Sequence, residues 1–201
     1  MPRVPYIDME TLDPIREDPT PYDPDFVTDH NLHRAMSNHP ELVRVFWPRI
    51  GKWIHTQSTI ARRLRELAII TASYVTASGY EFAWHAHGAV ENCGFTHDDL
   101  LGIIAEANGE TSTLNELDRH VCKAARDLTL DTQIDDATWS FLEKELGIKQ
   151  LLELVVTTSY YNHVIRVVGA VKISIEGENG EADREPYLKR YSPPKHVGTW
   201  R

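Results

Sequence analysis

The sequence contains few cysteines. Cys93 and Cys122 are the only two among 201 residues, and they do not form a Cys-x-x-Cys pair. A framework of disulfide bonds is therefore excluded, and so is the dithiol motif of thioredoxin-like redox proteins.

Other signals are also missing. No apolar run approaches the roughly 18 residues that a membrane span requires. The N-terminus is acidic and rich in proline, without the apolar stretch of a signal peptide. Lys and Arg number 21 against 30 Asp and Glu, a formal net charge of -9, which argues against unaided binding of nucleic acid. No glycine-rich phosphate or dinucleotide motif is present, so no cofactor is predicted. We expect a cytoplasmic protein that binds neither membranes nor nucleic acid.

The composition divides the chain into three parts. Residues 1–28 hold six prolines and seven acidic residues, which predicts an irregular N-terminal arm, either lying on a surface or disordered. Residues 176–201 form a polar C-terminal tail, with Tyr187, Tyr191 and Trp200 as possible anchors. Residues 29–175 form the domain between them.

Signals for strands are weak, and the central domain carries residues that typically begin and end helices. Pro40 suits the first turn of a helix, Pro48 predicts a kink, Thr96 predicts a cap, and Gly147 predicts a helix end. We predict an all-α fold of roughly seven or eight helices, at residues 29–37, 40–54, 60–77, 80–93, 97–107, 114–129, 136–146 and 148–173.

The last of these helices is apolar on nearly all sides. In a protein outside the membrane such a helix is buried on nearly all sides, either by the rest of its own domain or by another subunit. The pattern predicts a homo-oligomer.

Residues 78–91 carry the first candidate chemistry. Glu81 and His85 are four residues apart and share one helix face, whereas His87 aligns with Glu91 on the other side. Each feature also has a structural interpretation. Ser78-x-x-Glu81 fits a capping box, His87 and Glu91 fit an exposed pair, and His85 fits a hydrogen-bonded core histidine.

Glu66 is a third candidate. Arg62 and Arg63 lie one turn before it, which is typical of a surface salt bridge. If Glu66 instead faces the interior, burial is expected to raise its pKa into a useful range for proton transfer.

The order of these residues resembles the carboxymuconolactone decarboxylase and alkylhydroperoxidase D superfamily. The resemblance depends on two motifs, Arg65-Glu66 and then Tyr80-Glu81-Phe82-Ala83-Trp84-His85. Downstream, NCGFTHDDL and the closing segment with its Tyr-Asn at residues 161–162 are also similar, as is the opening segment HNLHRAMSNHPELVRVFWP. The similarity covers most of residues 29–175 and neither tail.

The resemblance implies an all-helical fold that forms trimers or hexamers, with Glu66, Glu81 and His85 lining a pocket near a subunit boundary. In the family's peroxidase branch two cysteines occupy the positions of Ser78 and Glu81. Since serine and glutamate cannot perform thiol chemistry, a dithiol peroxidase is disfavoured.

The candidate catalytic groups that remain are carboxylates and an imidazole. We predict a cofactor-independent carboxy-lyase acting on a small organic acid or lactone, with His85 as acid or base, Glu81 fixing its tautomer or relaying protons, and Glu66 as a second proton-transfer group. The alternatives are a hydroperoxide-reducing redox protein that uses Cys93 and a non-catalytic oligomeric binding protein. Cleavage of a C–C bond, isomerisation and hydrolysis stay open as reaction types.

The predicted substrate-binding residues are Ser78, Trp84, Asn162 and Arg166. Asn162 and Arg166 continue a polar stripe from Thr158, so Arg166 fits either a substrate carboxylate or a salt bridge between subunits. Trp84 fits either core packing or a pocket wall. No metal is predicted, because no third ligand accompanies Glu81 and His85 locally; His55, His97 and His163 stay available for sites formed by the fold.

Overall fold

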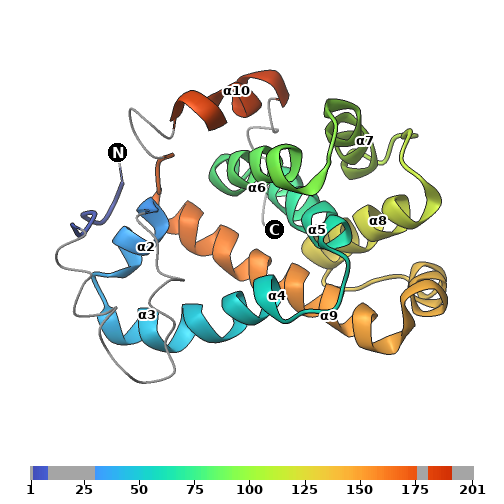
Figure 1. Ribbon diagram of the computed structural model, residues 1–201, viewed down its shortest axis with the longest axis horizontal. Coiled ribbons are helices and arrows are strands. Elements are labelled where there is room, and N and C mark those ends of the chain that lie inside the picture. Colours follow the sequence, from blue (N-terminus) through green and yellow to red (C-terminus); the bar gives the residue numbers. More distant parts are fainter. Residues whose placement is uncertain (1, 9–29, 176–180, 192–201) are drawn as a thin grey trace.

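The computed structural model describes residues 2–8, 30–175 and 181–191. Within these ranges the chain is all-helical, with nine α-helices, one π-helical turn and no strand. This confirms the predicted fold class. The helices are α2 (Asn31–Met36), α3 (Pro40–Phe46), the π-turn η2 (Trp47–Gly51), α4 (Lys52–Thr56), α5 (Arg62–Val75), α6 (Gly79–Cys93), α7 (His97–Ala107), α8 (Glu116–Asp131), α9 (Asp136–Val171) and α10 (Glu181–Tyr191) (Figure 1).

The helix ends follow local chemistry. The predicted cap at Thr96 is confirmed as a full capping box, because Thr96 accepts from the amide of Asp99 while the Asp99 side chain bonds back. At Pro48, where a kink was predicted, the structure has the π-turn that joins α3 to α4. Gly147 has a φ of 72° and interrupts α9, which therefore consists of two helical segments, as the sequence predicted.

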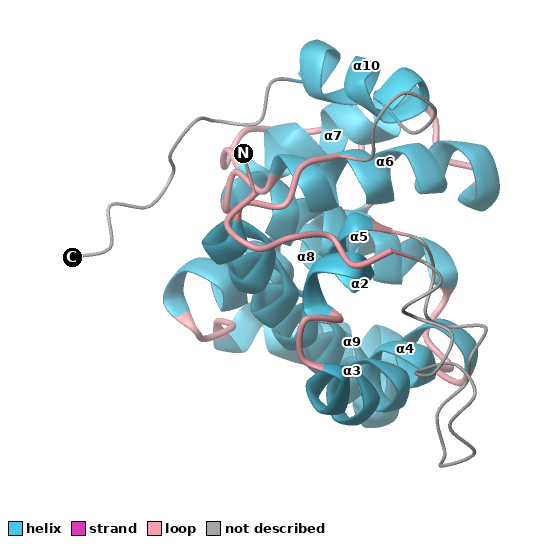
Figure 2. Cartoon of the chain, turned by 90° about the vertical axis from the view of Figure 1, so that its left-hand side faces the viewer, coloured by secondary structure: helices cyan, strands magenta, loops and turns pink. Residues whose placement is uncertain are grey.

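Helix α5 forms the centre of the molecule. All residues from Leu64 to Val75 are buried, and the helix packs against α6, α8 and α9 (Figures 1 and 2). Helix α9 is only partly covered in the single chain. Its side chains Ile148, Leu152 and Val156 are 51%, 50% and 43% exposed.

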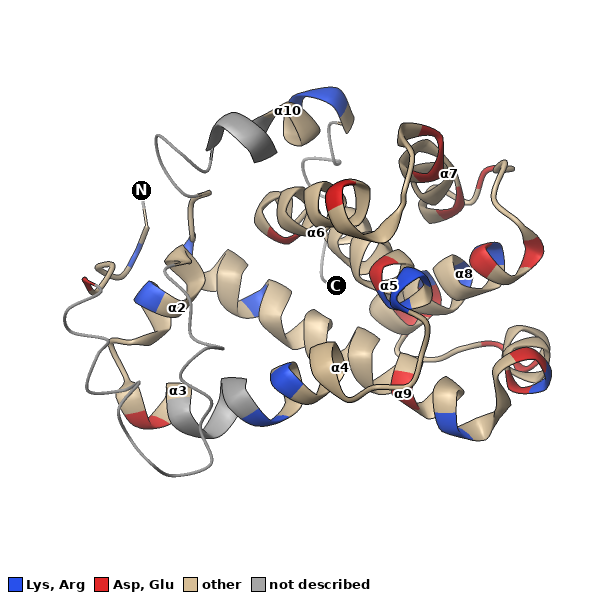
Figure 3. Ribbon diagram, in the orientation of Figure 1, with Lys and Arg blue, Asp and Glu red and all other residues tan. Residues whose placement is uncertain are grey.

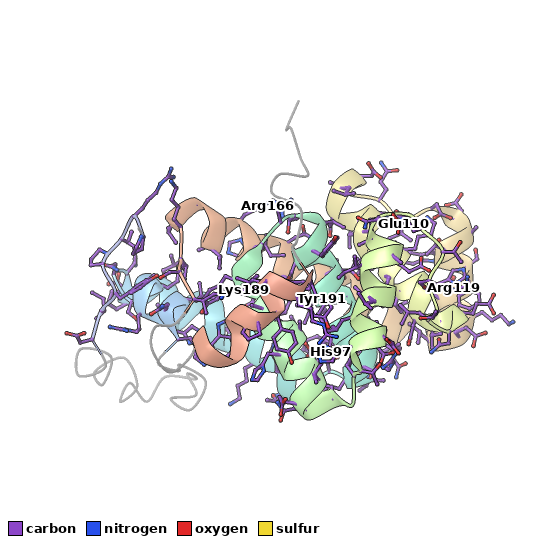
Figure 4. All side chains as sticks on the ribbon, turned by 90° about the horizontal axis from the view of Figure 1, so that it is seen from above. His97, Glu110, Arg119, Arg166, Lys189 and Tyr191 are labelled. Carbon is purple, nitrogen blue, oxygen red and sulfur yellow. The ribbon has the colours of Figure 1, made fainter. Side chains whose placement is uncertain are left out.

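The C-terminal region differs from the sequence prediction. Residues 176–201 were expected to form a polar tail, yet residues 181–191 form helix α10, which packs against α6 (Figure 2). The anchoring role of Tyr191 is confirmed, since its side chain is buried, hydrogen-bonds to His97 (Figure 4) and packs on Phe82. Trp200 lies outside the described residues.

Residues 2–8 of the N-terminal arm lie on the surface of the domain. The amide of Arg3 donates to the carbonyl of Val171 at 2.8 Å, and the hydroxyl of Tyr6 lies 2.9 Å from that of Ser174. The arm thus joins the start of the chain to the end of α9. Residues 9–29 lie outside the described ranges.

Charge is unevenly distributed over the helices. Acidic residues gather on α7 and the beginning of α8 (Figure 3), whereas α9 has no Asp, Glu, Lys or Arg between Glu153 and Arg166. None of the helices in the described residues combines the length and the apolar character needed to cross a bilayer.

Candidate functional site

The structure brings Glu66, Glu81 and His85 together where α5 packs against α6. Oε2 of Glu66 lies 2.7 Å from Nδ1 of His85, and Oε2 of Glu81 lies 3.6 Å from Nε2 of the same ring. The imidazole is therefore held between two carboxylates. Glu66 and Glu81 are 5% and 4% exposed, so both carboxylates lie in the interior.

The second oxygen of Glu66 binds a neighbour in sequence. Nε and one terminal nitrogen of Arg65 each lie 3.3 Å from Oε1 of Glu66, and the other terminal nitrogen donates to the carbonyl of Ile54 at 3.1 Å. The predicted surface salt bridge between Glu66 and Arg62 or Arg63 is wrong. Arg63 instead contacts Asp99 and Asp118.

Glu66 and His85 form an ion pair. Burial by itself raises the pKa of Glu66, but the charge and hydrogen bond of His85, together with Arg65, outweigh it and lower this pKa to about 2. Burial likewise opposes charge on His85, yet Glu66 and Glu81 raise the pKa of the imidazole above its ordinary value. The expectation of a raised pKa for Glu66 is therefore wrong, because its partners matter more than its burial.

A second hydrogen-bonded pair lies against this ion pair. Nε2 of His55, in α4, is 2.6 Å from the hydroxyl of Tyr161, in α9. The Tyr161 ring meets the His85 ring edge-on at a centroid distance of 4.8 Å and an angle of 90°. The rings of His55 and His85 are 6.4 Å apart. The site thus draws on four helices: α4, α5, α6 and α9.

The second pair is electrically neutral. Burial, followed by the charges of His85 and Arg65, lowers the pKa of His55 to about 4. Burial and the nearby carboxylates of Glu81 and Glu66 raise the pKa of Tyr161 well above its usual value. The site therefore favours the neutral form of the His55 imidazole and the charged form of the His85 imidazole. The sequence identified His55 only as an available histidine and Tyr161 only as part of the Tyr-Asn dipeptide.

The capping interpretation of Ser78 and Glu81 is wrong. Ser78 occupies the N-cap position of α6, but its side chain makes no capping hydrogen bond. The Glu81 carboxylate reaches along the helix to His85 instead. Trp84, on the same helix, is half-buried and packs against His30, with ring centroids 4.0 Å apart.

Asn162 and Arg166 lie further along α9. The side-chain amide of Asn162 donates to Thr129 of α8 at 2.8 Å, and exposed Arg166 donates to the side-chain oxygen of Asn162 at 2.7 Å. These contacts tie the polar stripe to the end of α8. Arg166 lies on the outer side of the molecule (Figure 4). Its predicted role in substrate binding stays a prediction.

Both thiols have raised pKa values. Cys122 is fully buried in the core on α8, and burial raises its pKa to about 12. Burial and the charge of Glu66 also raise the pKa of Cys93, whose sulfur contacts the carbonyl of Gly88 at 3.6 Å. A raised pKa reduces the thiolate fraction, so neither cysteine has the activation that a thiol peroxidase requires.

Within the described residues, no three side chains of the metal-binding types are arranged to hold an ion. The sequence matches no protein-family model, and a comparison with curated proteins finds no match. The functional argument therefore depends on the geometry of the site and on the motifs quoted above.

Proposed function

We propose that this protein is a cofactor-independent carboxy-lyase-type enzyme that acts on a small organic acid or lactone. His85 is its proton-transfer group. The observation that carries the proposal is the half-buried imidazole held between Glu66, at 2.7 Å, and Glu81, at 3.6 Å.

His85 is suited to act as an acid. When a substrate with an adjacent carbonyl loses CO2, the electron pair of the broken C–C bond moves onto the carbonyl oxygen and an enolate remains. A proton must then be delivered to carbon, and the raised pKa of His85 favours the protonated ring that can deliver it. The neutral imidazole regains its proton from solvent.

The geometry favours Nε2 as the atom that delivers the proton. Nδ1 is engaged with Glu66 at hydrogen-bond distance, whereas the 3.6 Å contact of Nε2 with Glu81 is longer than a hydrogen bond. Glu66, with a pKa of about 2, stays ionised and acts as a positioning residue that fixes the ring and stabilises its charge. The sequence had predicted Glu66 to be a second proton-transfer group, and the positioning role replaces that prediction.

The exposed apolar side chains of α9 support the proposed homo-oligomer, and the family resemblance implies a trimer or hexamer. Ile148, Leu152 and Val156 follow one another at intervals of four residues, so they share one face of the helix. An exposed stripe of this kind is typical of a surface that associates.

The test is an assay for release of CO2. Purified protein is mixed with 4-carboxymuconolactone or, as simpler β-keto acids, oxaloacetate and acetoacetate. We expect release from at least one of them, and a loss of roughly 10²-fold or more in His85→Gln. Glu91→Gln, an exposed change on the same helix, is the matched control. Equal rates of CO2 release in wild type and His85→Gln would refute the proposal.

A further inference from the structure

The pair formed by His55 and Tyr161 has no role in the proton delivery described above. The pair nevertheless belongs to the same site. The centroids of the Tyr161 and His85 rings are 4.8 Å apart, and the Tyr161 hydroxyl lies 2.6 Å from Nε2 of His55. Tyr161 is only 6% exposed. A buried phenol held against the imidazole that pairs with Glu66 calls for a chemical explanation.

We propose that the Tyr161 hydroxyl donates a hydrogen bond to the substrate oxygen on which negative charge develops, and that His55 positions this hydroxyl. The inference rests on the proposed function, because it supplies the group that the enolate intermediate needs besides the acid. It assigns Tyr161 as a catalytic residue and His55 as a positioning residue.

The geometry fits the shape of an enolate. The carbon that accepts the proton and the oxygen that carries the charge are two bonds apart, so their donors must lie close together. His85 and Tyr161 are in direct ring contact, although they come from α6 and α9. Donors fixed in advance at the developing charge are usually the largest single contribution to catalysis of this type.

The protonation states also fit. An oxyanion donor must keep its hydrogen, and burial with the nearby carboxylates raises the pKa of Tyr161 well above its usual range. His55 stays neutral at pH 7, because its pKa is lowered to about 4. In the tautomer that carries hydrogen on Nε2, His55 donates to the phenol oxygen and orients the phenol hydrogen toward the ligand.

This arrangement specifies the substrate class. A substrate must present a carbonyl oxygen that is conjugated with the carbon that loses CO2 and lies two bonds from the carbon that accepts the proton, as in a β-keto acid or a carboxylated unsaturated lactone. A simple carboxylic acid without such a carbonyl offers Tyr161 no oxygen to stabilise.

The first experiment separates chemistry from binding. Tyr161→Phe retains the ring against His85 and removes only the hydroxyl. With 4-carboxymuconolactone or oxaloacetate we expect kcat to fall roughly 10²–10³-fold, with KM changed less than about threefold. Tyr74→Phe, a buried tyrosine of α5 that packs on Phe82, is the control. An unchanged kcat in Tyr161→Phe, while His85→Gln is inactive, would overturn this inference and leave the proposed function standing.

The second experiment needs no turnover. The 4-nitrophenolate ion carries its charge on an oxygen attached to unsaturated carbon, and its visible absorbance reports binding. We expect wild type to bind it about 10-fold or more tightly than Tyr161→Phe. If wild type releases no CO2 from any probe but shows this preference, the proposed function fails and the donor role stands. Equal affinities, or no binding to wild type, would overturn the donor role.

The positioning role of His55 has its own readout. His55→Leu removes the contact to the Tyr161 hydroxyl, whereas His55→Gln retains an N–H that can reach it. We expect kcat to fall in His55→Leu and to recover in part in His55→Gln, with KM unchanged in both. Equal losses in the two variants would show that His55 only fills space.

Discussion

Oε2 of Glu66 and Nδ1 of His85 are separated by 2.7 Å, although the two residues belong to different helices and lie 19 positions apart. The contact closes the hairpin of α5 and α6 and sets the charge of the imidazole. Because Arg65 occupies the other oxygen of Glu66, the carboxylate has one orientation toward the ring. Both the proposed acid and the stability of this hairpin therefore depend on one carboxylate.

The first prediction concerns Glu66→Gln. Glu66 contributes the largest share of the rise in the pKa of His85, so this pKa should fall when the carboxylate charge is removed. NMR titration of labelled histidine measures this pKa directly. Release of CO2 at neutral pH should fall about 10-fold or more, since a smaller fraction of the ring carries the proton to be delivered. Glu91→Gln should change neither quantity, and an unaltered His85 titration would contradict the ion pair.

The second prediction is a pH dependence of stability caused by His55. Its pKa is lowered from 6.5 to about 4, so the unfolded chain binds more protons than the folded one between these values. Stability contributed by the neutral ring is present above pH 6.5 and is lost as pH falls to about 4, by up to about 3 kcal/mol. Urea unfolding at pH 7 and pH 4 measures the loss. His55→Gln should lose correspondingly less, and identical pH profiles would refute the assignment.

The site illustrates what local sequence can establish. Thr96, Pro48 and Gly147 act through their own backbone neighbourhoods, so their effects on the helices were predictable from nearby residues alone. The meeting of Glu66, Glu81 and His85 at one site was predicted from the resemblance to a family motif. Arg65 as the partner of Glu66 was not, because two other arginines lie at the helical spacing that usually makes such pairs.

The remaining features depend on contacts between distant segments. His55 and Tyr161 are 106 residues apart, and no sequence period connects them. Helix α10 was missed because Pro186 stands inside it, where proline removes a backbone hydrogen bond. Tertiary contacts hold this helix in place, because Tyr191 is buried and hydrogen-bonds to His97. Such contacts cannot be read from the local sequence around the proline.

The third prediction concerns the thiols. Cys93→Ser should retain release of CO2 within about twofold, because its raised pKa leaves little thiolate and the proposed acid is an imidazole. Consumption of hydrogen peroxide by wild type should equal that of Cys93→Ser. A peroxidase activity lost only in Cys93→Ser would favour the redox alternative over the carboxy-lyase.

The fourth prediction concerns assembly through α9. Leu152 is 50% exposed between Ile148 and Val156, and a glutamate there would place a charge in the middle of the apolar stripe. If this stripe forms the subunit interface, Leu152→Glu should shift the mass measured by light scattering from an oligomer toward a monomer, because an unpaired charge is costly to bury. Leu101→Glu, at an equally exposed leucine of α7, controls for the added charge and should keep the mass of wild type. Tyr161 of the site lies on the same helix as the stripe. Release of CO2 should therefore also be measured on the separated subunits, to show whether the site functions in one chain. A monomeric wild type, or an oligomer unaffected by Leu152→Glu, would mean that α9 is not the interface.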